Sequence, residues 1–252
     1  MAIKSKQENS RVSRRSNREN LSSSVLFTFT PKIEFLLEFL NVGITPRYAF
    51  ERLPGSAKAY IAPMKCFCDI PLGNVKYHME RYGYYGIGLK KSFLRKHGAT
   101  PVIYVHSNSR MLKNISKGKI LEKEYNSILP LLKRCDGDDY CYDINGANHT
   151  KKRIYFYDEK EWRYLPPQSE YEIITLFEKI DSGLKKAKTM NAESPYFKYV
   201  LRIPLDAIEY IIIRKERELD GIIQIVKENY TASELNMLLT KVQTAENILR
   251  DF

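Results

Sequence analysis

Short runs of apolar residues, some of them alternating with polar ones, recur along most of the chain. A run of this kind, bounded by glycine, proline or a small polar cluster, is typical of a β-strand. The pattern predicts strands at residues 25–29, 64–72, 84–89, 101–106, 153–158, 161–166, 199–204, 208–215 and 241–248. The runs 153–158 and 161–166 are expected to form a hairpin, and 199–204 and 208–215 a second strand pair.

Between these runs, apolar residues three and four positions apart indicate amphipathic helices. Ile33, Leu36 and Leu40 share one face and follow Thr30, whose side chain can cap a helix, and Pro31, which suits the first turn. The same spacing predicts helices near residues 72–82, 92–97, 117–134, 169–186, 219–226 and 231–240. Residues 136–152 show no periodicity and are expected to form a long loop.

Strands that come mostly as sequence neighbours favour an α+β fold over a doubly wound one. We therefore expect a mixed, mostly antiparallel central sheet with flanking helices. At this length, residues 23–252 can bury one core and are expected to fold as a single domain. Residues 1–22 are polar, Ser-rich and basic, so they are predicted to be a flexible basic arm.

The formal net charge of +11 is spread unevenly. Residues 1–20 contain six Lys or Arg and two Glu, a net +4, which leaves +7 on the rest of the chain. A positive field of this size attracts polyanions, and nucleic acid is the commonest of them. The alternative is that these charges only solvate helix faces.

Composition also excludes some classes of protein. The chain has no apolar run of about 18 residues and begins without the apolar core of a secretory signal, so no membrane contact and a cytoplasmic location are expected. Free thiols are expected for the cysteines of such a chain. Their C-x-C and C-x5-C spacings do not match zinc sites, so no metal site is predicted.

The segment EKEWRY, residues 159–164, holds the strongest candidate for chemistry. In an extended strand, Glu161 and Arg163 share one face, while Trp162 and Tyr164 share the other. The aromatic pair is the natural core face, which leaves Glu161 and Arg163 facing solvent or a cleft. A partly exposed ion pair would contribute about 0–1 kcal/mol, whereas a carboxylate in a cleft can stabilise developing positive charge.

Several uncommon strings stand in a fixed order along the chain: FTFTPKIEFLLEFLNVGITPRY, APMKCFCDIPL, YGYYGIGLKKSF and YDEKEWRY. In this respect the chain resembles the AbiGi family of abortive phage-resistance proteins, described as antitoxins of two-component systems. The similarity runs from about Val25 to the terminal TAENILRDF. It implies an anti-phage role and a partner protein of the same defence system.

A second, weaker resemblance is to ADP-ribosyltransferases of the DarT kind, and it implies an ADP-ribosyltransferase-like fold with NAD as cofactor. That family carries a His or Arg on an early strand, an aromatic or hydroxyl residue on a middle strand and a Glu on a late strand. The resemblance places Thr28, Tyr85 and Glu161 at these positions. Gly86 would let the dinucleotide approach the middle strand, and Arg163 would lie beside it.

The chemistry explains why such residues are needed. Cleaving the bond between nicotinamide and ribose leaves an oxocarbenium-like sugar, which a carboxylate stabilises in the transition state. Thr28 departs from the usual His or Arg because it carries no charge, and this puts catalysis in doubt. Arg47 is the alternative phosphate contact, or else a loop residue in water.

Three functions remain open at this point. The first is an ADP-ribosyltransferase that transfers ADP-ribose from NAD to nucleic acid or protein, with Glu161 as its catalytic residue. Alternatively, it is a non-catalytic antitoxin that binds a partner toxin. The third possibility is a nucleic-acid-binding module that works through its arm and basic surface.

Overall fold

The structure is a computed structural model, and it describes residues 22–53, 59–112, 127–142, 149–167, 174–176, 180–193 and 199–251. The helices are α1 (Ile33–Asn41), α2 (Lys76–Tyr82), α3 (Lys91–Lys96), α6 (Ile180–Glu193), α7 (Leu219–Val226), α8 (Ala232–Leu239) and α9 (Ala245–Asp251). Short 3-10 helices include η1 (Leu72–Asn74) and η3 (Phe156–Glu159). The predicted arm falls almost wholly on residues 1–21, outside the described residues.

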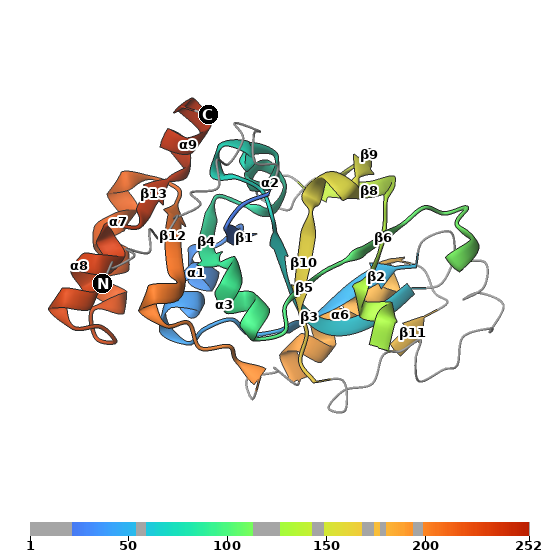
Figure 1. The fold of residues 1–252 in the computed structure, drawn as a ribbon, viewed down its shortest axis with the longest axis horizontal. Coiled ribbons are helices and arrows are strands. Elements are labelled where there is room, and N and C mark those ends of the chain that lie inside the picture. Colours follow the sequence, from blue (N-terminus) through green and yellow to red (C-terminus); the bar gives the residue numbers. More distant parts are fainter. Residues whose placement is uncertain are drawn as a thin grey trace, which may run out of the picture.

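The main sheet has the strand order β13-β12-β4-β1-β3-β10-β5, with β2 and β11 also paired to β3 (Figure 1). These strands are β1 (Val25–Thr30), β2 (Arg47–Arg52), β3 (Ala59–Cys68), β4 (Tyr85–Lys90), β5 (Thr100–Pro101), β10 (Glu161–Tyr164), β11 (Ile174–Leu176), β12 (Ile208–Ile213) and β13 (Val242–Thr244). Only the β12–β13 pair of this sheet is parallel among the described residues. The expected α+β fold with a mixed, mostly antiparallel sheet is therefore confirmed.

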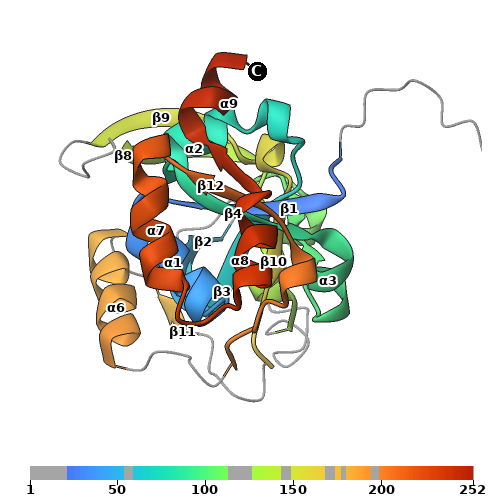
Figure 2. The ribbon, with the colours of Figure 1, turned by 90° about the vertical axis from the view of Figure 1, so that its left-hand side faces the viewer.

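Helices cover both faces of the sheet, because apolar side chains of its central strands point alternately to one face and to the other. Leu26 of β1 faces the core cluster that contains apolar residues of α1, α3, α7 and α8. Its neighbours Val25 and Phe27 face the other cluster, which contains residues of α2 and α9. The two helical layers are visible on either side of β1, β4 and β12 in Figure 2. Such period-two burial on both faces is what an interior strand requires.

The sheet splits between β1 and β3. Within these two fully described strands, a single pair of opposite residues, Phe27 and Cys68, joins them. Farther along, β1 continues beside β4, while β3 continues beside β2 and β10. The edges of β1 and β3 therefore diverge at the middle of the sheet, and this split positions the candidate site.

Several sequence-based expectations were wrong in the same region. The segment expected to be a loop forms part of a hairpin of β8 (Asp136–Tyr142) and β9 (His149–Tyr155). Strand β10 pairs with β3 and β5 rather than with β9. The run at 199–204 is not a strand, and Leu201 makes only an isolated bridge to Ile44.

The helix expected at 117–134 ends earlier than predicted: residues 127–128 are helical, but those after them are not α-helix. Its last residues form strand β7 (Leu132–Arg134), which pairs in parallel with β6 (Ile103–Val105). Pro130 lies in the 3-10 turn just before β7, where a proline cannot continue an α-helix. Within the described part of the chain, none of the helices combines the length and the apolar character needed to cross a lipid bilayer.

Candidate functional site

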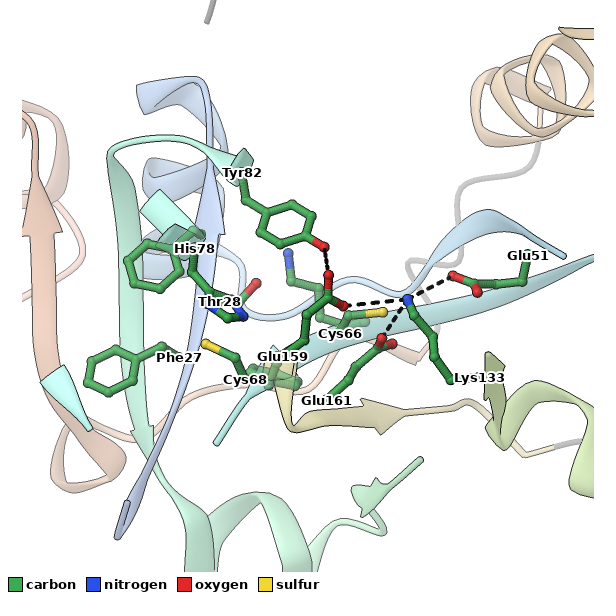
Figure 3. Close-up of a pocket in the computed structure, with 13 residues that line it drawn as sticks. Phe27, Thr28, Glu51, Cys66, Cys68, His78, Tyr82, Lys133, Glu159 and Glu161 are labelled. Atoms are coloured by element: carbon green, nitrogen blue, oxygen red, sulfur yellow. Dashed lines mark hydrogen bonds and ion pairs between the residues drawn. The ribbon is translucent and has the colours of Figure 1, made fainter. Parts of the chain in front are cut away.

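A cavity of about 240 Å³ opens where β1 and β3 diverge (Figure 3). Consecutive residues of both strand edges line it, together with side chains from α2, β2, β7 and the turn before β10. The apolar side consists of Phe27, Phe29 and Phe67, with the thiols of Cys66 and Cys68. The polar side consists of Glu51, Lys133, Glu159, Glu161, His78 and Tyr82, with Thr28 and Lys65 completing the lining.

A tight turn directs two carboxylates into this cavity. Glu159 ends η3, Lys160 follows in the left-handed conformation with φ of 43°, and Glu161 begins β10. The backbone N–H of Asp69 donates to the Lys160 carbonyl, which fixes the turn against the end of β3. Such a conformation is costly for a residue with a side chain, so the surrounding contacts must hold it.

Glu161 is bonded through both carboxylate oxygens. Arg163 Nε donates to Glu161 Oε1 at 2.6 Å, and Lys133 Nζ lies 2.8 Å from Glu161 Oε2. Glu161 is 5% exposed and Arg163 is 0% exposed. The backbone N–H of Glu161 also donates to the hydroxyl of Tyr104 at 2.8 Å. The carboxylate is therefore held by two cations in a dry setting.

The network extends through the cations to further buried groups. Arg163 Nη1 donates to the Tyr60 hydroxyl at 3.0 Å and to the Pro130 carbonyl at 2.5 Å, and Arg163 Nη2 lies 3.2 Å from Glu51. Lys133 lies between Glu51, Glu159 and Glu161, as Figure 3 shows. Charge is balanced, with three carboxylates, Glu51, Glu159 and Glu161, facing three cations, Arg81, Lys133 and Arg163.

The two carboxylates of the turn have opposite pKa shifts. Burial alone would raise the pKa of Glu161, but the charges and hydrogen bonds of Arg163 and Lys133 hold it well below its usual range. Burial raises the pKa of Glu159 despite the nearby Lys133 and Arg81, although Arg81 Nη1 lies 2.8 Å and the Tyr82 hydroxyl 2.9 Å from it. Lys133 is shared with Glu51 and Glu161, so it compensates the burial of Glu159 only in part. The ionised carboxylate of Glu161 thus stabilises the folded state, whereas ionisation of Glu159 is less favourable in the folded state.

This difference predicts an acid-dependent stability. The folded-state pKa of Glu161 is lowered, so its contribution is complete above the unfolded value of about 4.3 and is lost as the pH falls below it. The folded-state pKa of Glu159 is raised, so protonating Glu159 offsets part of that loss. Urea midpoints measured from neutral pH to about pH 3 should fall steeply below about pH 4.3, and the Glu161→Gln variant should lose much of that slope. An equal slope in both proteins would contradict the assignment.

Of the two settings expected for Glu161 and Arg163, solvent or a cleft, exposure to solvent is wrong, while Glu161 does line a cavity. Both side chains are buried, while Trp162 and Tyr164 are half-buried against the cluster on the opposite face. The predicted alternation is present, but Tyr60, Pro130 and Lys133 cover the polar face of β10. The pair is a buried ion pair and not the surface pair that the sequence suggested.

The structure brings together only some of the other predicted residues. Thr28 lines the same cavity as Glu161. Tyr85 and Gly86 do not line it, since β1 and β3 separate β4 from β10. The Tyr85 hydroxyl donates to Glu218 at 2.8 Å, and a Cβ added to Gly86 would lie 2.9 Å from the Phe29 ring. The glycine therefore makes room for a phenylalanine of β1.

Arg47 and Arg163 are likewise engaged elsewhere. Arg47 Nη2 lies 2.6 Å from Glu38, and its guanidinium lies 5.4 Å from the centre of the Phe35 ring on α1. Arg163 sits behind Glu161 and does not line the cavity. The cavity, at about 240 Å³, is smaller than the roughly 300–1,000 Å³ of typical small-molecule sites, and NAD as a cofactor stays a prediction. Among the described residues, no cluster of three metal-ligating side chains occurs either.

Sequence reasoning missed most of the network. Glu51 gave no signal, and Lys133 fell within an expected helix. Glu159 could have been found, because it stands two residues before Glu161 and the left-handed Lys160 turns both carboxylates the same way. His78 was also missed: it is 4% exposed and lies in the cavity wall beside Tyr82.

Comparison with known proteins gives the chain a family. The sequence profile described as "Putative abortive phage resistance protein AbiGi, antitoxin" matches residues 55–214. The "Abortive phage resistance protein AbiGi" of Lactococcus lactis subsp. cremoris is 26% identical over 225 residues, covering 77% of this chain and 90% of that protein. No solved structure matches the chain, so the ADP-ribosyltransferase-like part of the fold expectation gains no support from known structures. The profile match includes β3, β4, β10 and β12 and most of the residues that line the cavity, although β1 and β2 lie before it, and by this match the chain belongs to the AbiGi family.

Proposed function

We propose that the protein acts in abortive phage resistance as a non-catalytic antitoxin, which binds and restrains a partner protein of the same defence system. The family description and the printed name of the Lactococcus relative support the defence role. A binding role needs a stable folded surface and no reacting group. The proposal therefore depends on whether Glu161, the strongest candidate for a catalytic residue, is free to react.

The state of Glu161 carries the proposal. A catalytic carboxylate needs a lone pair that its substrate can reach. Both oxygens of Glu161 are instead within 2.8 Å of Arg163 and Lys133, and the group is almost fully buried. Thr28, the other predicted residue at the cavity, has no charge to fix a phosphate. These features suit a carboxylate that stabilises the fold.

Growth measurements test the antitoxin role. Each gene beside this one should be expressed alone and together with this chain in the same host. We expect one neighbour to slow growth alone and this chain to restore it, whereas a frameshifted copy that yields only the messenger RNA should not. The proposal is contradicted if no neighbour is toxic or if the frameshifted copy rescues equally well.

ADP-ribosyl transfer is the second candidate, because Thr28 and Glu161 line one cavity. The purified protein should be incubated with labelled NAD together with protein and nucleic-acid acceptors. The antitoxin proposal expects no protein-dependent transfer or NAD cleavage. Transfer by the folded wild-type protein would replace that proposal with the enzymatic one. Glu161→Gln alone cannot decide this, since the substitution also removes a buried charge.

Nucleic-acid binding through residues 1–22 stays a separate prediction. Ser22 is the only described residue of that segment. The basic charge of residues 1–21 is known from sequence alone.

A further inference from the structure

A second hollow lies outside the cavity, between α2 and the β8–β9 hairpin. It has a volume of about 460 Å³, within the roughly 300–1,000 Å³ of typical ligand sites. We call it the tyrosine groove; the aromatic and charged side chains that line it are Tyr77, His78, Arg153, Tyr155, Asp158 and Lys160. In Figure 1, α2 and the hairpin stand at the same end of the molecule, apart from the C-terminal helices α7 and α8.

Two tyrosines give the groove exposed aromatic surface. Tyr155 is 60% exposed and Tyr77 is 44% exposed, so much of each side chain is open to a ligand. Tyr155 makes no ring contact among the described residues, and Tyr77 packs T-shaped against His78 at 6.0 Å between ring centres and hydrogen-bonds to Arg81. Exposed aromatic rings of this kind are suited to stacking on nucleobases.

His78 adds an unsatisfied polar group to the wall of the groove. It is 4% exposed, and neither ring nitrogen makes a hydrogen bond of good geometry among the described residues, although the nearby Glu159 backbone raises its pKa. Burial and the nearby Arg81 lower the pKa of His78 to about 4, so the ring is neutral at physiological pH and offers one donor and one acceptor. Leaving such a group unpaired is unfavourable, and a ligand in the groove would satisfy it.

Charge completes the arrangement. Arg153 pairs with Asp136, but its side chain is 62% exposed, and exposed pairs of this kind are weak enough to exchange for a phosphate. The first described residues of the chain lie near the groove. Ser22 and Ser23 hydrogen-bond to Asp69, and Asp69 directly precedes Ile70 and Pro71, which line the groove. The segment that ends there carries a net +4 over its first 20 residues.

We propose that the tyrosine groove binds single-stranded nucleic acid, with bases stacked on Tyr77 and Tyr155, a base edge bonded to His78 and phosphate contacted by Arg153. This combination of aromatic platforms and positive charge is the one that single-strand binding proteins use. The inference does not depend on the antitoxin role. A protein segment is the competing occupant, and the test below separates the two.

Fluorescence anisotropy with short labelled single-stranded RNA and DNA tests the proposal on the full chain. Tyr77→Ala and Tyr155→Ala should each weaken binding about fivefold or more, and the double variant should weaken it further. Arg153→Gln should lower the slope of log affinity against log salt by about 0.7. The stronger of the RNA and DNA signals identifies the preferred strand.

Tyr157→Ala is the matched control, because Tyr157 is 63% exposed but lies outside the groove against Tyr104. It should leave affinity unchanged, and circular dichroism should show all variants folded. Absence of binding at about 50 mM salt, or equal affinity in the Tyr77/Tyr155 double variant, would overturn the proposal. If the tyrosine variants instead lose only the capture of a partner protein, the groove is a protein-docking site and the nucleic-acid proposal also fails.

Discussion

Glu161→Gln should lower the free energy of unfolding by about 3–5 kcal/mol, the usual result of removing one partner from a buried ion pair. Glutamine preserves size but removes the charge that Arg163 and Lys133 face. Arg163 has no access to water, and the substitution removes the carboxylate of Glu161, which lies closest to its charge. Urea denaturation at neutral pH, followed by circular dichroism, measures the loss.

Glu38→Gln is the control for that experiment. The Arg47–Glu38 distance is also 2.6 Å, but these side chains are 42% and 19% exposed. Because water screens such a pair, its removal should cost less than about 1 kcal/mol. Similar losses for the two variants would show that Glu161 is not in the dry, charge-balanced setting described above.

Gly83→Ala should be comparably severe, with a loss of about 3–5 kcal/mol from backbone strain and overpacking together. Gly83 follows α2 with φ of 119°, a conformation that residues with a side chain rarely adopt. A Cβ there would lie 2.2 Å from the Thr30 carbonyl oxygen and 2.3 Å from the Pro31 nitrogen, and both are backbone atoms that cannot simply rotate away. Thermal unfolding of the purified variant measures the effect.

Gly221→Ala serves as the opposite case. Gly221 lies inside α7, and an added Cβ would meet nothing within 4 Å. Because alanine favours the helix, this variant should gain about 0.5–1 kcal/mol. If Gly83→Ala were tolerated as well as Gly221→Ala, the close packing of the α2–β4 turn against β1 would be contradicted.

Local signals in the sequence predicted much of the fold. Strand β1, helix α1 and the end of α2 at Gly83 all occur near their expected positions. Each depends on residues close together in the chain, such as the apolar face of α1 or a glycine with positive φ. The α+β class followed because most strands have sequence neighbours that are also strands.

Pairing between distant segments was less accessible. Residues 153–158 and 161–166 look like a hairpin locally, yet the left-handed Lys160 and the bond from Asp69 direct β10 onto β3. β9 pairs with β8 instead. No local pattern encodes these choices, because the alternatives satisfy alternation equally well.

The same limit explains why most residues of the candidate site were not predicted from the sequence. Glu161 was recognised because alternation along the strand places it with Arg163 on the face opposite Trp162 and Tyr164. Its partners could not be recognised: Lys133 comes from β7 and Glu51 from β2, far away in sequence. A buried charge is tolerated only when such partners converge, so the burial of Arg163 becomes apparent only in three dimensions.

Direct titration of Glu161 tests the central claim that this carboxylate is a buried structural anion. Glutamate carboxyl carbons labelled with carbon-13 can be followed by nuclear magnetic resonance from neutral pH downward, with Glu161→Gln assigning the signal. The account predicts that Glu161 stays ionised below its usual value of about 4.3, while Glu159 titrates above it. A Glu161 signal that titrates at or above about 4.3, as expected of an acid free to react, would contradict the account.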